Sequence, residues 1–147
     1  MPIKQITPQA DIEAYLQDQL AKREMEIIRT LSYVGIQCVN EAKLHPGYQD
    51  RSSNLRSSIG FAVLKDGVVI HRPPLEQIKD GKKGISEGND FLSRLISENT
   101  KGIVLIVVAG MNYAAYVETD RNVITSAELL AEDLVPKLLR QLGFQVR

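Results

Sequence analysis

A stripe of apolar residues at helical spacing fills most of the first 44 residues and constrains the fold more than any other feature. Ile12, Leu16 and Leu20 recur every four positions, and after the charged interval Lys22-Arg23-Glu24 the stripe resumes with Ile27, Ile28, Leu31, Val34, Cys38, Val39 and Ala42. Thr7 as N-cap and Pro8 at the first helical position form a start signal, and Pro46 stops the pattern near Leu44. Some 36 residues at about 1.5 Å each make a rod of about 54 Å. Such a rod either bends near Lys22–Met25 or carries part of its stripe to another subunit.

Length and charge narrow the class of protein. The chain has 147 residues, and residues 1–147 are predicted to form a single domain. Its 44% hydrophobic and 24% charged residues exclude a wholly disordered or collagen-like chain. Eighteen basic residues balance eighteen acidic ones, so we expect no specific nucleic-acid partner. One cysteine, Cys38, excludes an intrachain disulfide and fits a reducing compartment, and no apolar run is long enough to expect a membrane partner.

The middle of the chain carries strand signals. Ile59–Leu64 and Val68–His71 flank a short link with an Asp-Gly pair, which is typical of a β-hairpin. The β-branched run Ile103–Ala109 predicts a central strand, and Tyr113–Glu118 predicts a further strand or a bent extension past Gly110. We therefore expect a mainly antiparallel sheet of about four strands.

Two further segments complete the predicted order. Residues 72–102 are rich in Gly, Pro and charge, and we expect a partly mobile excursion with one short helix after Asn89 or Asp90. Thr125 and Glu128 have the spacing of a capping box before a leucine-rich helix, which Pro136 should kink or split and Gly143 should stop. The predicted fold class is α+β.

Residues able to carry chemistry form no recognisable motif. His45 and His71 have no Cys or His at metal-ligand spacing, and the serines at 52, 53, 57 and 58 lack a nucleophile-elbow pattern. We expect no metal, no cofactor, no catalytic residues and no enzyme activity. A small hydrolase that uses a serine or the carboxylates of Glu118 and Asp120 is the weakest alternative, and a pocket that gathers them with His71 would favour it.

Two short segments resemble those of one protein family. Residues 48–59 read Tyr-Gln-Asp-Arg-Ser-Ser-Asn-Leu-Arg-Ser-Ser-Ile, and residues 113–118 read Tyr-Ala-Ala-Tyr-Val-Glu. They resemble the Asp-x-Thr-Gly-x-Leu-Arg-x-Ser-Ile segment and the Tyr-Ala-x-Tyr-Val-Glu strand of the small tail-component (neck or tail-completion, head–tail joining) proteins of long-tailed bacteriophages and prophages. The order of predicted elements is similar as well. Ser52-Ser53 stands where the family has Thr-Gly, so a turn that relies on a glycine with positive φ is expected to be remodelled.

The resemblance implies a structural virion protein of the head–tail junction. Its expected partners are copies of itself, in a ring for which six subunits is the leading expectation, and the phage connector, neck and tail-tube proteins. The protein would be assembled in the bacterial cytoplasm and end in the virion. The alternative is a non-viral cytoplasmic binding or regulatory module.

Six residues in the matching segments are the expected interaction residues: Asp50, Leu55, Arg56, Tyr113, Tyr116 and Glu118. From the motif positions, Leu55 is expected to be buried, while Arg56 faces outward or pairs with an acid such as Glu118.

Overall fold

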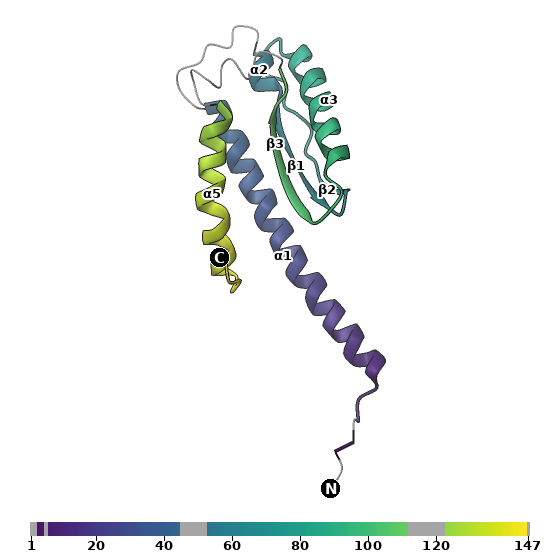
Figure 1. Cartoon of the computed structure of the whole chain (residues 1–147). Coiled ribbons are helices and arrows are strands. Elements are labelled where there is room, and N and C mark those ends of the chain that lie inside the picture. Colours follow the sequence, from purple (N-terminus) through teal and green to yellow (C-terminus); the bar gives the residue numbers. More distant parts are fainter. Residues whose placement is uncertain (1–2, 5, 45–52, 112–122, 147) are drawn as a thin grey trace.

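The computed structural model of the chain describes residues 3–4, 6–44, 53–111 and 123–146. In chain order they form α1 (Gln9–Leu44), α2 (Asn54–Ser57), β1 (Ile59–Lys65), β2 (Val68–His71), α3 (Lys82–Glu98), β3 (Ile103–Ala109) and α5 (Val123–Gln141). The predicted α+β class is confirmed, with a long N-terminal helix, an antiparallel sheet and a C-terminal helix (Figure 1).

Helix α1 has 36 residues and ends at Leu44, as the apolar stripe predicted. The carbonyl of Pro8 accepts N–H bonds from Asp11 at 3.1 Å and Ile12 at 3.3 Å, so Pro8 directly precedes the helix instead of occupying its first position. The helix continues through Lys22–Met25 without a break. Its N-terminal part extends beyond both the sheet and α5, so neither of them covers this end of the apolar stripe (Figure 1).

The sheet contains the predicted hairpin. Strands β1 and β2 are antiparallel, and both Asp66 and Gly67 have positive φ, at 49° and 81°, as a two-residue type I′ turn requires. Strand β3 pairs antiparallel with β1, and the register runs from Ile59 opposite Ala109 to Lys65 opposite Ile103.

Strand order is β2-β1-β3, so β1 holds the centre of the described sheet. We predicted the central place for Ile103–Ala109, because it is the most apolar and β-branched run of the chain. The structure accounts for that composition differently, because helices cover both faces of β1 and β3. Three strands are seen among the described residues. The predicted fourth, Tyr113–Glu118, lies outside them.

Helix α3 begins at Lys82, well before the start predicted after Asn89 or Asp90, and it packs on the sheet as a full layer. The prediction was wrong because glycines usually interrupt helices. Here Gly84 and Gly88 face α2 and the start of β1, where an added Cβ would lie 2.0 Å from the Asn54 carbonyl oxygen and 2.7 Å from that of Ser58. The missing side chains allow close backbone contact, which compensates for the low helix propensity. The mobility of residues 72–102 stays a prediction.

Helix α5 begins at Val123, so Thr125 lies inside the helix and does not cap it. Pro136 lies within the same helix, which is therefore not split in two, and the expected kink stays a prediction. Proline has no N–H to donate, so the carbonyl four residues earlier lacks its usual helical partner.

Helix α5 ends at Gln141, just before the predicted stop at Gly143, whose φ is 91°. The N–H groups of Phe144 and Gly143 donate to the carbonyls of Leu139 and Arg140, each at 3.0 Å. This is a Schellman arrangement, in which glycine supplies the left-handed residue. The turn directs Phe144 back toward α1.

The sheet separates two layers of helices (Figure 1). Helix α3 covers one face, where Leu92 packs against Ala62, Leu64, Ile106 and Val108. Helices α1 and α5 cover the other face. That core contains Val34, Cys38, Leu55, Ile59, Phe61 and Val63, and most of these side chains are almost completely buried.

Candidate interaction surface

Two of the six predicted interaction residues fall within the described part of the chain. Leu55 is 1% exposed and belongs to the core between α1, the sheet and α5, as expected from its motif position. Arg56 is half-buried, and its Nε donates to the carbonyl oxygen of Lys43 at 3.0 Å, in the last turn of α1. Arg56 therefore supports a helix end. Its interface role stays a prediction, as do the roles of Asp50, Tyr113, Tyr116 and Glu118, which lie outside the described residues.

Ser53 has φ 59° and ψ 19°, a left-handed conformation that serine seldom adopts. The remodelling expected of this turn stays a prediction, and Ser53 has a positive φ although it is not a glycine. The side chain is 1% exposed, and its hydroxyl has no hydrogen-bond partner among the described residues. Ser53 directly precedes α2, where the chain enters the sheet. The packing at this junction stabilises the strained backbone and the unpartnered hydroxyl.

Cys38 and His71, the cysteine and the histidine of the described residues, both make packing contacts. The Cys38 thiol donates to the carbonyl oxygen of Ala127 at 3.3 Å, and burial, followed by the charge of Glu41, raises its pKa. The ring of His71 meets the ring of Phe61 edge to face, with centroids 5.5 Å apart.

Of the residues considered for a hydrolase, Glu118 and Asp120 lie outside the described ranges, so a pocket that joins them to His71 is not part of the described structure. Within the described ranges, His, Cys, Asp and Glu form no group of three that could hold a metal ion.

The most unusual described surface is the N-terminal part of α1, Gln9–Lys22, which we call the arm. Twelve of its fourteen residues are exposed. They include the apolar side chains of Tyr15, Leu16 and Leu20, at 63%, 60% and 60% exposure. Isolated exposed leucines are common on proteins, but an apolar stripe over several turns indicates a surface that a partner covers.

The arm stripe is the direct continuation of the α5-facing side of α1. Eighteen residues of α-helix make five full turns, so Leu16 points in the same direction as Val34, and Leu20 in the same direction as Cys38. Val34 and Cys38 are fully buried in the core that α5 completes. The arm therefore presents the same kind of side chains in the same direction, but without a covering helix.

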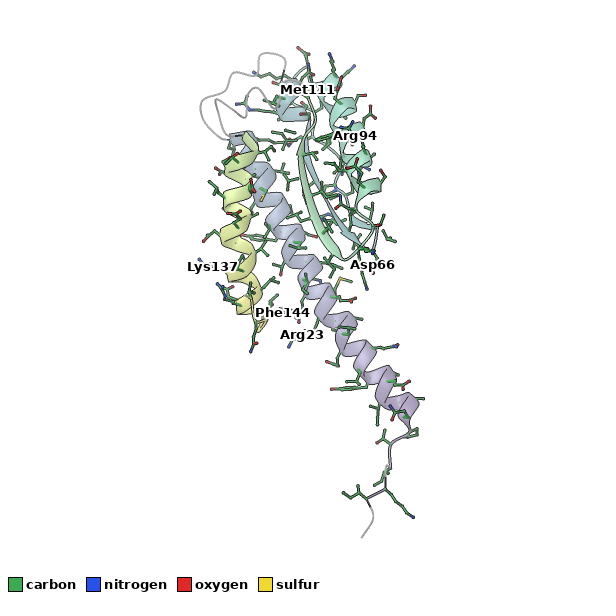
Figure 2. All side chains as sticks on the ribbon, in the orientation of Figure 1. Arg23, Asp66, Arg94, Met111, Lys137 and Phe144 are labelled. Atoms are coloured by element: carbon green, nitrogen blue, oxygen red, sulfur yellow. The ribbon has the colours of Figure 1, made fainter. Side chains whose placement is uncertain are left out.

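The cover ends at Arg23 and Glu24. Arg23 Nη1 donates to the carbonyl oxygen of Leu142 at 3.0 Å, and its guanidinium lies 5.3 Å from the centroid of the Phe144 ring (Figure 2). Glu24 pairs with Lys65 of β1 and raises the Lys65 pKa, mainly through that hydrogen bond. The turn after α5 and strand β1 thus contact α1 at Arg23 and Glu24, and the arm, which ends at Lys22, lies directly N-terminal to these contacts.

A groove of about 370 Å³ lies beside this boundary, between α1 and α5. We call it the α1–α5 groove, and its lining residues are Arg29, Thr30, Tyr33, Leu138, Gln141 and Leu142. Tyr33 and Leu142 are 50% and 38% exposed, and Arg29 is the only charged residue of the lining. The groove is therefore apolar with one cation at its side.

Strand β2 is a second uncovered surface. It forms one edge of the sheet, and Val68, Val69 and Ile70 are all exposed by more than two fifths. Natural proteins usually protect such an edge with charge or proline, because its free backbone groups can pair with another chain.

The sequence pointed to the arm, because the apolar stripe is longer than a domain of this size needs. It did not reveal the α1–α5 groove, whose two sides come from helices about a hundred residues apart. The only sequence signal for the groove was Gly143, which stops the leucine-rich helix and so limits how much of α1 that helix can cover.

In the described helices, none is long and apolar enough to cross a membrane. Comparisons with protein-family models, curated proteins and solved structures give no match.

Proposed function

We propose that this chain is a structural protein of a phage head–tail junction, a neck or tail-completion subunit that works by self-assembly and docking, with no catalytic turnover. Its partners would be further copies of the chain, in a ring for which six is the leading number, and the connector, neck or tail-tube proteins. It would be assembled in the bacterial cytoplasm and remain in the virion.

The observation that carries the proposal is the arm. A helix that continues its apolar stripe for 14 residues beyond its own covering helix has a surface to bury, and a subunit of an assembly buries such a surface against its neighbour. The exposed edge of β2 is further support, because backbone pairing between neighbouring subunits would satisfy its free N–H and C=O groups. The two segments that resemble the tail-component family direct the proposal to the phage junction.

Deletion of the gene in the phage or prophage that encodes it tests the role in the virion. We expect electron microscopy of the resulting lysate to show filled heads and separate or incomplete tails, because the joining subunit is missing. Expression of the wild-type chain from a plasmid should restore joined particles. Joined, infectious particles in the deletion strain would contradict the proposal.

A further inference from the structure

We infer that the arm of one copy docks in the α1–α5 groove of a second copy, in a head-to-tail contact. This inference rests on the proposed function only for the claim that the chain self-associates. It goes further by naming both halves of the contact, which lie on different surfaces of the same chain.

The first argument is the match of apolar surfaces. The arm presents Tyr15, Leu16 and Leu20 on neighbouring turns, and the groove offers the exposed faces of Tyr33 and Leu142 beside Leu138. The groove between two packed helices can bind a third, amphipathic helix, whose anchor residues recur at spacings of three and four. Docking would bury the arm stripe against a neighbouring copy, as α5 and the sheet bury the rest of the stripe within its own chain.

The second argument is charge. The arm carries Asp11, Glu13 and Asp18 against the single base Lys22, a net charge of −2. Arg29 is the one charged residue of the groove lining, and Lys137 lies one turn from Gln141 on α5. An acidic arm is therefore attracted to the groove, whereas two arms packed on each other bring like charges together. Charge favours arm-in-groove over arm-on-arm pairing.

The third argument is symmetry. A contact between two different surfaces is heterologous, and each copy that donates its arm still has a free groove for the next copy. Repetition of the contact gives a closed ring when the rotation per subunit divides a full turn, and an open filament when it does not. Arm-on-arm pairing would instead stop at a symmetric dimer.

Cysteine cross-linking tests the contact. In a Cys38→Ala background, one variant carries Leu16→Cys and a second, with a mass tag, carries Tyr33→Cys. Residues 16 and 33 of one α1 helix lie about 26 Å apart, far beyond the span of a disulfide, so any bond between them joins two copies. We expect oxidation of the mixture to give the mixed covalent dimer within minutes, and Leu16→Cys alone to give little dimer.

Leu129→Cys is the matched control. Leu129 is also a leucine with 60% exposure on a helix, but it lies outside the groove lining. Mixed with Leu16→Cys, it should link at least tenfold more slowly than Tyr33→Cys. Equal rates, or fast homodimers of Leu16→Cys alone, would overturn the inference in favour of random collision or arm-on-arm pairing.

Charge reversal provides a second test that leaves the apolar contact unchanged. Arg29→Glu should weaken self-association at least tenfold at low salt, and the difference from wild type should shrink as salt rises. Unchanged self-association of Arg29→Glu would overturn the inference. A chain that forms assemblies without the cross-link contradicts the arm–groove contact alone, whereas joined particles after gene deletion contradict the proposed function.

Discussion

The two halves of α1 have the same apolar pattern and opposite surroundings. From Arg23 to Leu44 the stripe packs under α5 and the sheet, and Val34, Cys38 and Ala42 are fully buried. From Gln9 to Lys22 the stripe continues in the same direction, and most of its side chains face solvent. The difference lies in the partners of the helix. Helix α5 stops at a glycine turn while α1 continues, so the chain completes one half of its own core and leaves the other half open.

The stability of the monomer should therefore depend on the buried half of α1, Arg23–Leu44, and not on the arm. Val34→Asp places an unpaired carboxylate in a position with no solvent exposure, and we expect it to lower the free energy of unfolding by at least about 3 kcal/mol. Leu20→Asp, the same kind of change on the arm, should alter it by less than about 0.5 kcal/mol. Urea unfolding at concentrations where the chain is monomeric measures both. A large loss for Leu20→Asp would mean that the arm is covered within its own chain.

The packing of α3 should contribute to monomer stability, as the buried half of α1 does. Gly84→Ala adds a methyl group 2.0 Å from the backbone oxygen of Asn54, where neither backbone moves freely. We expect a loss of about 2 kcal/mol in urea unfolding, although alanine is the better helix former. Ser86→Ala, at an exposed position of the same helix, is the control and should change stability by less than about 0.5 kcal/mol. A neutral Gly84→Ala would show that α3 does not pack this closely.

The end of the covered half is held by Arg56. Arg56→Ala removes a charged donor from the Lys43 carbonyl, and we expect a loss of about 1 to 2 kcal/mol. Lys137→Ala, which removes an exposed cation from α5, should cost less than about 0.5 kcal/mol in the same assay. An unchanged free energy of unfolding for Arg56→Ala in urea would instead assign this arginine to an interface between subunits.

The smallest expected effect has the opposite sign. Ser53→Gly relieves a left-handed backbone and removes a buried hydroxyl without a described partner, and we expect a gain of about 1 kcal/mol. Ser53→Ala removes the same hydroxyl but keeps the backbone strain, so the difference between the two variants isolates the strain. Destabilisation by Ser53→Gly would show that the serine hydroxyl holds this junction.

Sequence patterns predicted the elements whose residues signal locally. The stripe of α1, the Asp66-Gly67 hairpin and the Gly143 stop follow from spacing and turn chemistry, and the structure confirms them. The start of α3 was missed because Gly84 and Gly88 are loop signals by themselves, and only contact with α2 gives them a helical role.

The same limit applies to the surface. The sequence indicated that α1 is too long for one domain, but the place where its cover ends depends on Phe144 and Leu142 meeting Arg23 across almost the whole chain. Four of the six residues chosen by resemblance lie outside the described structure, and their roles stay predictions.

The central claim is that the uncovered arm stripe is a self-association surface. Light scattering over a concentration series, on wild type, Leu16→Asp and Leu129→Asp, tests it most directly, since both leucines are 60% exposed and only one lies on the arm. We predict assemblies of several subunits for wild type and Leu129→Asp, seen as closed rings in negative stain, and a monomer for Leu16→Asp. A Leu16→Asp variant with the same mass as wild type at every concentration would contradict the account.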